Sequence, residues 1–150
     1  MSLYELYQDM VVDHSKAPRN FGKLGHTTHS AEGYNPLCGD KVFVYVDLRG
    51  DVIHDIHFEG SGCAISTAAA SLATEYLKSK KLSEFEEVFK KFHQLVTGQA
   101  CDVKNGPDLG KLTILEGVKE FPTRVKCATL VWHTIKNALK KQHEIATTEQ

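Results

Sequence analysis

The sequence lacks the features of membrane and secreted proteins. No apolar run in its 150 residues approaches the roughly 20 residues that span a bilayer. The first ten residues, MSLYELYQDM, contain no basic segment followed by an apolar one, so they predict no signal peptide. We therefore expect a cytoplasmic protein that does not contact a membrane.

The sequence also lacks an excess of charge of one sign. It has 18 Lys and Arg residues against 19 Asp and Glu residues, a formal net charge of -1. Binding to nucleic-acid phosphates relies on a basic face, so no nucleic-acid partner is expected. Internal repeats, low-complexity runs and Pro- or Ser-rich linkers are missing as well. The length is typical of one domain, and we predict a single domain over residues 1–150.

The order of the expected elements predicts an α+β fold. A helical apolar period covers residues 3–14, and two runs rich in β-branched and aromatic residues follow at 41–48 and 52–58. The turn between these runs contains Gly50, so they are expected to form a hairpin. More helical patterns follow: one after residue 62, one from about Ser83, one over 108–118 and one after Pro122. This order favours a small antiparallel sheet with helices packed on one face.

The candidate core lies on the apolar faces of these segments. The β-branched run is expected to bury Val42, Val44, Val46 and Leu48. The long helices are expected to bury Ile65, Ala68, Ala69, Leu72 and Tyr76; Phe85, Val88, Phe89, Phe92 and Val96; and Val125, Ala128, Trp132, Ile135 and Leu139. The polar tail, residues 140–150, is expected to be frayed.

Cysteine is scarce, and no two of the four cysteines form a Cys-x-x-Cys pair. In a reducing compartment they are expected to be free thiols, metal ligands or redox groups. Cys38 lies in a turn before a strand, where Gly39 can adopt a positive φ and let the Cys38 thiol and the Asp40 carboxylate face one point. Cys63 opens a helix, and Cys127 lies in the first turns of another. Because a helix N-terminus lowers a thiol pKa, these thiols are predicted to favour the thiolate.

Three thiolates and one carboxylate could share a metal ion. They would fill the tetrahedral shell of Zn²⁺, and Arg124 and Lys126 could offset the remaining negative charge. The separations between the three cysteines, 25 and 64 residues, are not those of a zinc finger. The alternative is that the cysteines are three buried small apolar side chains, a common state of free cysteine.

Four motifs occur in order along nearly the whole chain. They are DHSKAPRNFG at 13–22, NPLCGD at 35–40, GSGCAIS at 60–66 and VKCATL at 125–130. Together they resemble the IscU/SufU family of iron–sulfur cluster assembly proteins, which is NifU N-terminal-like. The resemblance implies a SufE/IscU-like α+β domain in which three cysteines and one aspartate converge on a metal. The ligands that it implies here are Cys38, Asp40, Cys63 and Cys127, with Arg124 and Lys126 supporting the anionic site.

Three departures make the chain more similar to the SufU branch than to the scaffold branch. Lys126 stands where the scaffold branch has a histidine, and EFPTRVK at 120–126 replaces its LPPVK stretch. The segment between Cys63 and Cys127 is also longer, with an apparent insertion around 99–118. The resemblance then implies a zinc-dependent sulfurtransferase that accepts persulfide sulfur from a pyridoxal-phosphate cysteine desulfurase and passes it to downstream iron–sulfur assembly proteins. Cys38 is the expected sulfur-accepting, catalytic thiolate.

Two other functions stay open. A true scaffold would assemble a [2Fe–2S] cluster, or bind iron, on the same ligands, because thiolates are also ordinary cluster ligands. A structural zinc module would only bind partners, although an Asp ligand is unusual in such sites. Cys101 lies outside every motif and is expected to be a spare thiol. No histidine is included in the ligand set, and His14 is expected to serve packing or a hydrogen bond.

Overall fold

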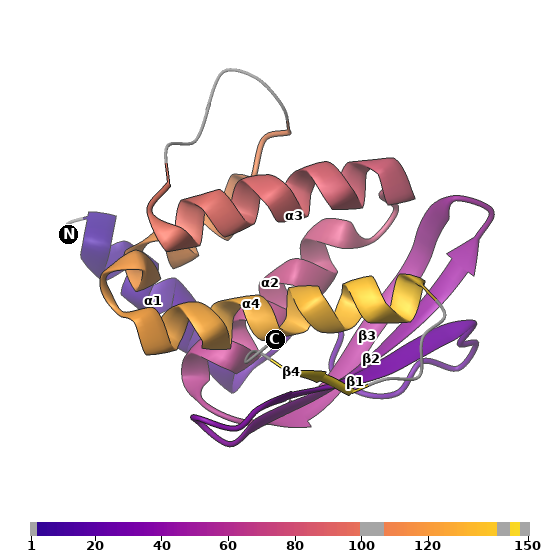
Figure 1. The fold of residues 1–150 in the computed structure, drawn as a ribbon, viewed down its shortest axis with the longest axis horizontal. Coiled ribbons are helices and arrows are strands. Elements are labelled where there is room, and N and C mark those ends of the chain that lie inside the picture. The colour runs from indigo at the N-terminus through magenta and orange to yellow at the C-terminus, as the bar shows by residue number, and fades with distance from the viewer. Residues whose placement is uncertain (1–2, 100–106, 141–144, 148–150) are drawn as a thin grey trace.

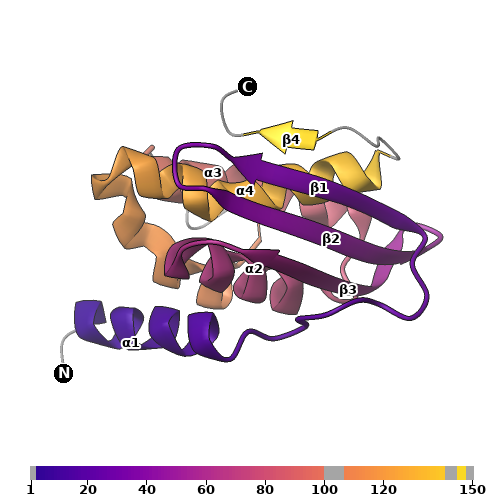
Figure 2. The same ribbon diagram turned by 90° about the horizontal axis from the view of Figure 1, so that it is seen from below.

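A sheet and a set of helices on one of its faces make up the structure (Figures 1 and 2). The structure is a computed structural model that describes residues 3–99, 107–140 and 145–147. In chain order the elements are α1 (Leu3–Lys16), β1 (His29–Asn35), β2 (Asp40–Arg49), β3 (Val52–Ser61), α2 (Ala64–Leu77), α3 (Leu82–Thr97), the 3-10 helix η1 (Gly110–Glu120), α4 (Pro122–Leu139) and β4 (Ile145–Thr147). The predicted α+β fold is confirmed.

The sheet has the strand order β3-β2-β1-β4. β2 pairs antiparallel with β3 on one side and with β1 on the other, and Gly50 at the β2–β3 turn has a φ of 62°. The predicted antiparallel hairpin is therefore confirmed. β4 adds a short parallel pairing to β1, with residues 145–147 opposite residues 32–34. The expectation that the whole tail is frayed is wrong for these three residues.

Strand β1 is absent from the elements expected from the sequence pattern. Its residues, HSAEGYN, include a glycine and several polar side chains, and they lack the apolar alternation that marks a strand. The strand forms because β2 offers it a full antiparallel ladder, from His29 opposite Val46 to Asn35 opposite Asp40. Gly33 also allows α4 to pack close to β1, since a Cβ at this position would overlap the Thr134 hydroxyl. Tertiary pairing, rather than local propensity, makes this strand.

The core lies between the sheet and the helices. α4 packs on β1 and β2, and α2 packs on β3 and α4. Trp132 is fully buried and stacks on Phe85 and Phe92, with ring centroids 6.0 and 5.0 Å away. The expected faces of β2, α2, α3 and α4 are buried or packed at the edge of the core. Leu48 is only half-buried, because a register shift between Asp47 and Leu48 breaks the alternation of β2.

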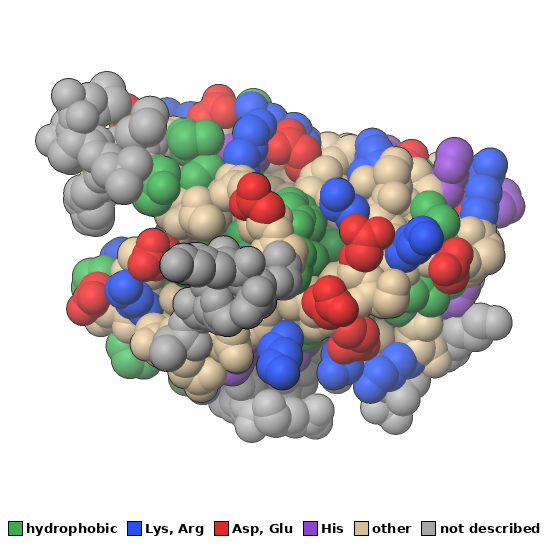
Figure 3. Space-filling view, turned by 90° about the horizontal axis from the view of Figure 1, so that it is seen from above, with side chains coloured by type: hydrophobic (Ala, Val, Ile, Leu, Met, Phe, Trp, Pro, Cys, Tyr) green, Lys and Arg blue, Asp and Glu red, His purple; other side chains and the backbone are tan. Residues whose placement is uncertain are grey.

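The remaining elements surround the ends of α2 and α4. α1 packs on α2, and η1 contacts all four α-helices. The predicted helical segment at 108–118 is thus confirmed, with 3-10 geometry. Over α3, basic and acidic side chains are interspersed, as the balanced composition predicts (Figure 3). None of the helices within the described residues is both long and apolar enough to cross a membrane.

Candidate metal centre

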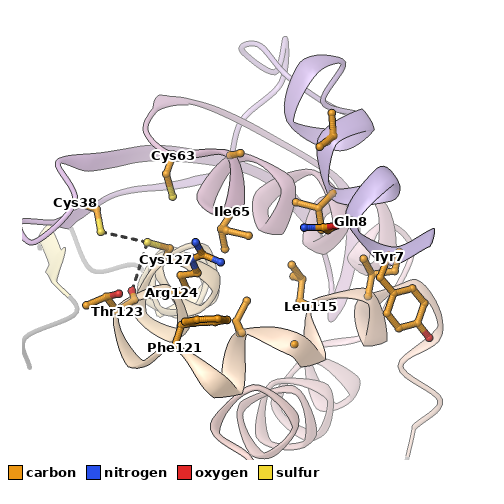
Figure 4. Close-up of a pocket in the computed structure, with 16 residues that line it drawn as sticks. Tyr7, Gln8, Cys38, Cys63, Ile65, Leu115, Phe121, Thr123, Arg124 and Cys127 are labelled. Atoms are coloured by element: carbon orange, nitrogen blue, oxygen red, sulfur yellow. Dashed lines mark hydrogen bonds between the residues drawn. The ribbon is translucent and has the colours of Figure 1, made fainter. Parts of the chain in front are cut away.

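Three cysteines from separate segments of the chain lie close together (Figure 4). Cys38 comes from the β1–β2 turn, Cys63 from the residue before α2, and Cys127 from α4. All three line a cavity of about 520 Å³, whose other walls come from α1, the start of α2, η1 and the start of α4. Cys38 is exposed, Cys63 is half-buried and Cys127 is buried, so the burial of the three thiols increases in that order.

Asp40 lies next to the thiols and is fully buried. Its Oδ1 accepts a hydrogen bond from the backbone N–H of Cys63 at 2.8 Å, and its Oδ2 lies 3.9 Å from Cys63 Sγ. Gly62 makes this approach possible, because a Cβ at that position would overlap Asp40 Oδ1. A buried carboxylate needs hydrogen bonds or a cation nearby, so Asp40 is placed for a role in the site.

The turn that carries Cys38 has the predicted conformation. Gly39 adopts a φ of 69°, a left-handed geometry that glycine favours. Cys38 Sγ lies 3.5 Å from Cys127 Sγ, and the ligand atoms of Cys38, Asp40 and Cys127 all lie within 4.8 Å of one another. Cys63 falls outside this group of three but contacts Asp40, so the four predicted ligands are neighbours.

The thiols differ in their ionisation. The pKa of Cys63 is lowered to about 7, chiefly because the Cys127 side chain hydrogen-bonds to it. Cys63 is the N-cap of α2, and its Sγ also accepts the backbone N–H of Ser66 at 3.4 Å. In contrast, the same hydrogen bond with Cys63, followed by burial, raises the pKa of Cys127. The prediction that Cys127 is biased toward the thiolate is wrong: Cys127 lies beyond the first turn of α4, and the Thr123 carbonyl lies only 3.5 Å from its Sγ.

The two predicted supporting cations lie in different places. Arg124 is exposed, lines the cavity, and holds its guanidinium 4.6 Å from the centroid of the Phe121 ring. Lys126 is half-buried on α4 and does not line this cavity. Their role in offsetting negative charge stays a prediction.

Asn35 is a site residue that is not among the candidates predicted from the sequence. It is fully buried, and its Nδ2 lies 3.2 Å from Asp40 Oδ2 and 3.6 Å from Cys127 Sγ. Its position at the start of the NPLCGD motif was a signal for it. Cys101 lies outside the described residues. His14 is buried and its Nδ1 lies 2.7 Å from Ser71 Oγ, which confirms the expected hydrogen bond.

The donor set fits a thiophilic metal ion. Sulfur ligands suit Zn²⁺ and iron–sulfur clusters, while a set of oxygen ligands would suit Mg²⁺ or Ca²⁺. The residues Cys38, Asp40 and Cys127 could hold such an ion together, with Cys63 next to them. The site opens onto the cavity through Cys38, so a second molecule can reach it.

The comparisons assign the chain to a family. The protein-family model for the NifU-like N-terminal domain matches residues 6–128 of this chain. The chain therefore belongs to this family of IscU/SufU-type proteins. It is 38% identical over 141 residues to the zinc-dependent sulfurtransferase SufU of Bacillus subtilis, covering 94% of each chain. It is also 38% identical to the iron–sulfur cluster assembly scaffold protein IscU of Streptococcus pyogenes serotype M1, covering 93% of this chain and 86% of that protein.

Solved structures agree with this assignment. A proposed iron–sulfur cluster assembly scaffold protein for the SUF system from Fervidobacterium islandicum AW-1 superposes with a TM-score of 0.81 at 34% identity. The match covers 92% of this chain and 99% of that one. The N-terminal part of a NifU-like protein from Brucella abortus matches with a TM-score of 0.79 at 17% identity, covering 91% of this chain and 94% of that one, and supports the fold alone. The predicted family and fold are confirmed.

Proposed function

We propose that this protein is a zinc-binding sulfur acceptor. It takes persulfide sulfur from a pyridoxal-phosphate cysteine desulfurase and supplies downstream iron–sulfur assembly proteins. The observation that carries this proposal is that three thiols line one open cavity, with the buried Asp40 carboxylate next to them. The similarity to a zinc-dependent sulfurtransferase supports it. Residues 1–150 would form one such domain, acting in the cytoplasm, where thiols stay reduced.

The proposed zinc ligands are Cys38, Asp40, Cys63 and Cys127. Bound zinc would stabilise the negative charge of the three thiolates and hold them close together. Asp40 contributes a harder oxygen ligand, so it is expected to bind zinc less tightly than the sulfurs do. Arg124, at the cavity wall, is placed to attract an anionic substrate, and Lys126 adds positive charge on the same helix.

Cys38 is the proposed sulfur acceptor because it is the exposed thiol of the three. Its thiolate attacks the terminal sulfur of the partner's protonated persulfide. The S–S bond breaks, and its electron pair leaves on the partner's cysteine as a thiolate. The terminal sulfur keeps its proton and is now bonded to Cys38, so the exchange needs no outside oxidant or reductant.

The surroundings of Cys38 suit a protein partner. Leu37, Val12 and Phe121 are large apolar side chains with 57%, 45% and 46% of their surface exposed. Val12 and Phe121 line the cavity, and Leu37 precedes Cys38. Exposed apolar side chains gathered beside a reactive group are typical of a protein interface. We therefore place the desulfurase segment that bears the persulfide against this cavity.

The test combines metal analysis with an activity assay. The anaerobically purified protein is expected to contain about one equivalent of zinc and to be colourless. It is also expected to increase the release of alanine from cysteine by the desulfurase. Colourless zinc protein that leaves the desulfurase unchanged would argue for a structural zinc module.

The second candidate is a scaffold for a [2Fe–2S] cluster. The relative from Streptococcus pyogenes, named a scaffold protein, is as similar in sequence as the zinc-dependent one. The same thiols would ligate the cluster. Brown protein with a visible charge-transfer band and little zinc would favour this function over sulfur transfer.

A further inference from the structure

We infer that Asn35 is a positioning residue of the metal centre: its buried amide holds Asp40 and Cys127 in place and slows the release of the metal. The inference rests on the ligand set of the proposed function. It concerns the residues around that set, which determine how firmly a ligand is oriented.

The sheet register places Asn35 beside Asp40. Asn35 is the last residue of β1 and pairs with Asp40, the first residue of β2. Its Nδ2 lies 3.2 Å from Asp40 Oδ2 and 3.6 Å from Cys127 Sγ. A primary amide carries two N–H groups, so it can donate to both ligand atoms at once.

A third contact fixes the orientation of the amide. Asn35 Oδ1 accepts the backbone N–H of Leu37 at 3.3 Å. Exchanging the amide oxygen and nitrogen would place an oxygen against the Asp40 carboxylate and the NH₂ group against the Leu37 N–H. The observed orientation avoids both conflicts. One side chain thus contacts two proposed ligands and the turn that carries Cys38.

The two donated hydrogen bonds separate this role from ordinary turn stabilisation. An asparagine that only stabilises a turn uses its oxygen, as Asn35 does with Leu37. Here the amide nitrogen also points at two proposed ligand atoms in a fully buried site. Loss of such outer contacts typically lowers metal affinity about 10- to 100-fold.

The test measures zinc release directly. Asn35→Ala removes all three contacts, and Asn35→Ser keeps a hydroxyl that can still accept the Leu37 N–H. Each zinc-loaded variant is mixed with a chromophoric chelator, and the release half-time is recorded. Asn137→Ala, on the same helix as Cys127 but about 15 Å further along it, is the control. We expect release at least about tenfold faster from both Asn35 variants and unchanged from the control.

Cobalt substitution provides a readout besides release. Both Asn35 variants are expected to retain the intensity of the sulfur-to-cobalt charge-transfer band and to shift the d–d bands, because the thiolates remain but their orientation changes. Wild-type release and spectra in Asn35→Ser would overturn the inference, and this variant decides the question if Asn35→Ala does not fold. If the wild-type protein binds no metal through its cysteines, the proposed function is wrong, and this result is distinct from wild-type behaviour of Asn35→Ser.

Discussion

The backbone N–H of Cys63 donates a hydrogen bond to Asp40 Oδ1 at 2.8 Å. This contact joins the start of β2 to the start of α2, two segments that are 23 residues apart. The bond requires a close approach, because Gly62 lies against the carboxylate. The Gly-Ser-Gly stretch before Cys63 therefore has a role beyond ending β3: its last glycine makes room for a proposed ligand.

Gly62→Ala should disrupt this contact. The added Cβ would overlap Asp40 Oδ1, so the carboxylate must move and the Cys63 N–H loses its acceptor. We expect the free energy of unfolding of the metal-free protein to fall by about 1–3 kcal/mol, measured by urea denaturation. Gly25→Ala is the control, since nothing lies within 4 Å of a Cβ at that position. Equal stability of the two variants would show that Asp40 accommodates the methyl group.

The sequence predicted most of the fold because its apolar periods agree with the packing. Phe85, Val88, Phe89, Phe92 and Val96 are all buried on α3, as their spacing indicated. β1 could not be predicted, because its pairing with β2 provides what its polar residues do not. The short pairing of β4 depends on β1 in the same way.

The proposed ligands could be located from motifs, but their electrostatic differences could not. Sequence position treats Cys63 and Cys127 alike, as cysteines near helix starts. The interaction between the two side chains lowers the pKa of Cys63 and raises the pKa of Cys127, so the two pKa values move in opposite directions. Asn35 was missed for a related reason: only the register of β1 with β2 brings its amide to Asp40.

The pKa of Cys63 gives a prediction for the metal-free protein. The alkylation rate of Cys63, followed by peptide mass spectrometry, should rise with pH around a midpoint of about 7. Cys127→Ala removes the hydrogen bond that contributes most to the lowered pKa, so the midpoint should move upward. Cys38→Ala leaves that hydrogen bond in place and serves as the control. An unchanged midpoint in Cys127→Ala would mean that the helix terminus, rather than Cys127, sets the pKa.

His14 gives a pH dependence to stability. Burial lowers the pKa of His14 below 6.5, so in acid the unfolded chain takes up a proton more readily than the folded protein. The stabilisation is complete above about pH 6.5 and is lost as the pH falls toward the lower pKa of the folded state. In metal-free protein, His14→Gln should flatten this part of the curve of unfolding free energy against pH. His54→Gln changes an exposed histidine and should leave the curve as it is in the wild type.

Trp132 is expected to be a main source of stability. Its indole is fully buried against Phe85 and Phe92, at the point where α4 meets α3. Trp132→Ala should lower the free energy of unfolding by about 3–5 kcal/mol, because it removes a large buried side chain and leaves a cavity. Phe121→Ala, which truncates a half-exposed ring on the cavity wall, should cost much less. Thermal unfolding of the two variants at the same zinc loading checks this order.

The four cysteines should divide into three that are required and one that is not. Cys101 lies outside every family motif, so Cys101→Ser should bind zinc and stimulate the desulfurase as the wild type does. Cys38→Ser, Cys63→Ser and Cys127→Ser should each fail to stimulate it, since loss of one ligand from a closed set of four releases the metal or leaves a charge unbalanced. The measurement is alanine release by the desulfurase with each variant, beside the zinc content of the same preparation. If Cys101→Ser fell as low as the other three, the three-cysteine site would be wrong. If Cys38→Ser alone kept its activity, the acceptor would be another thiol of the set.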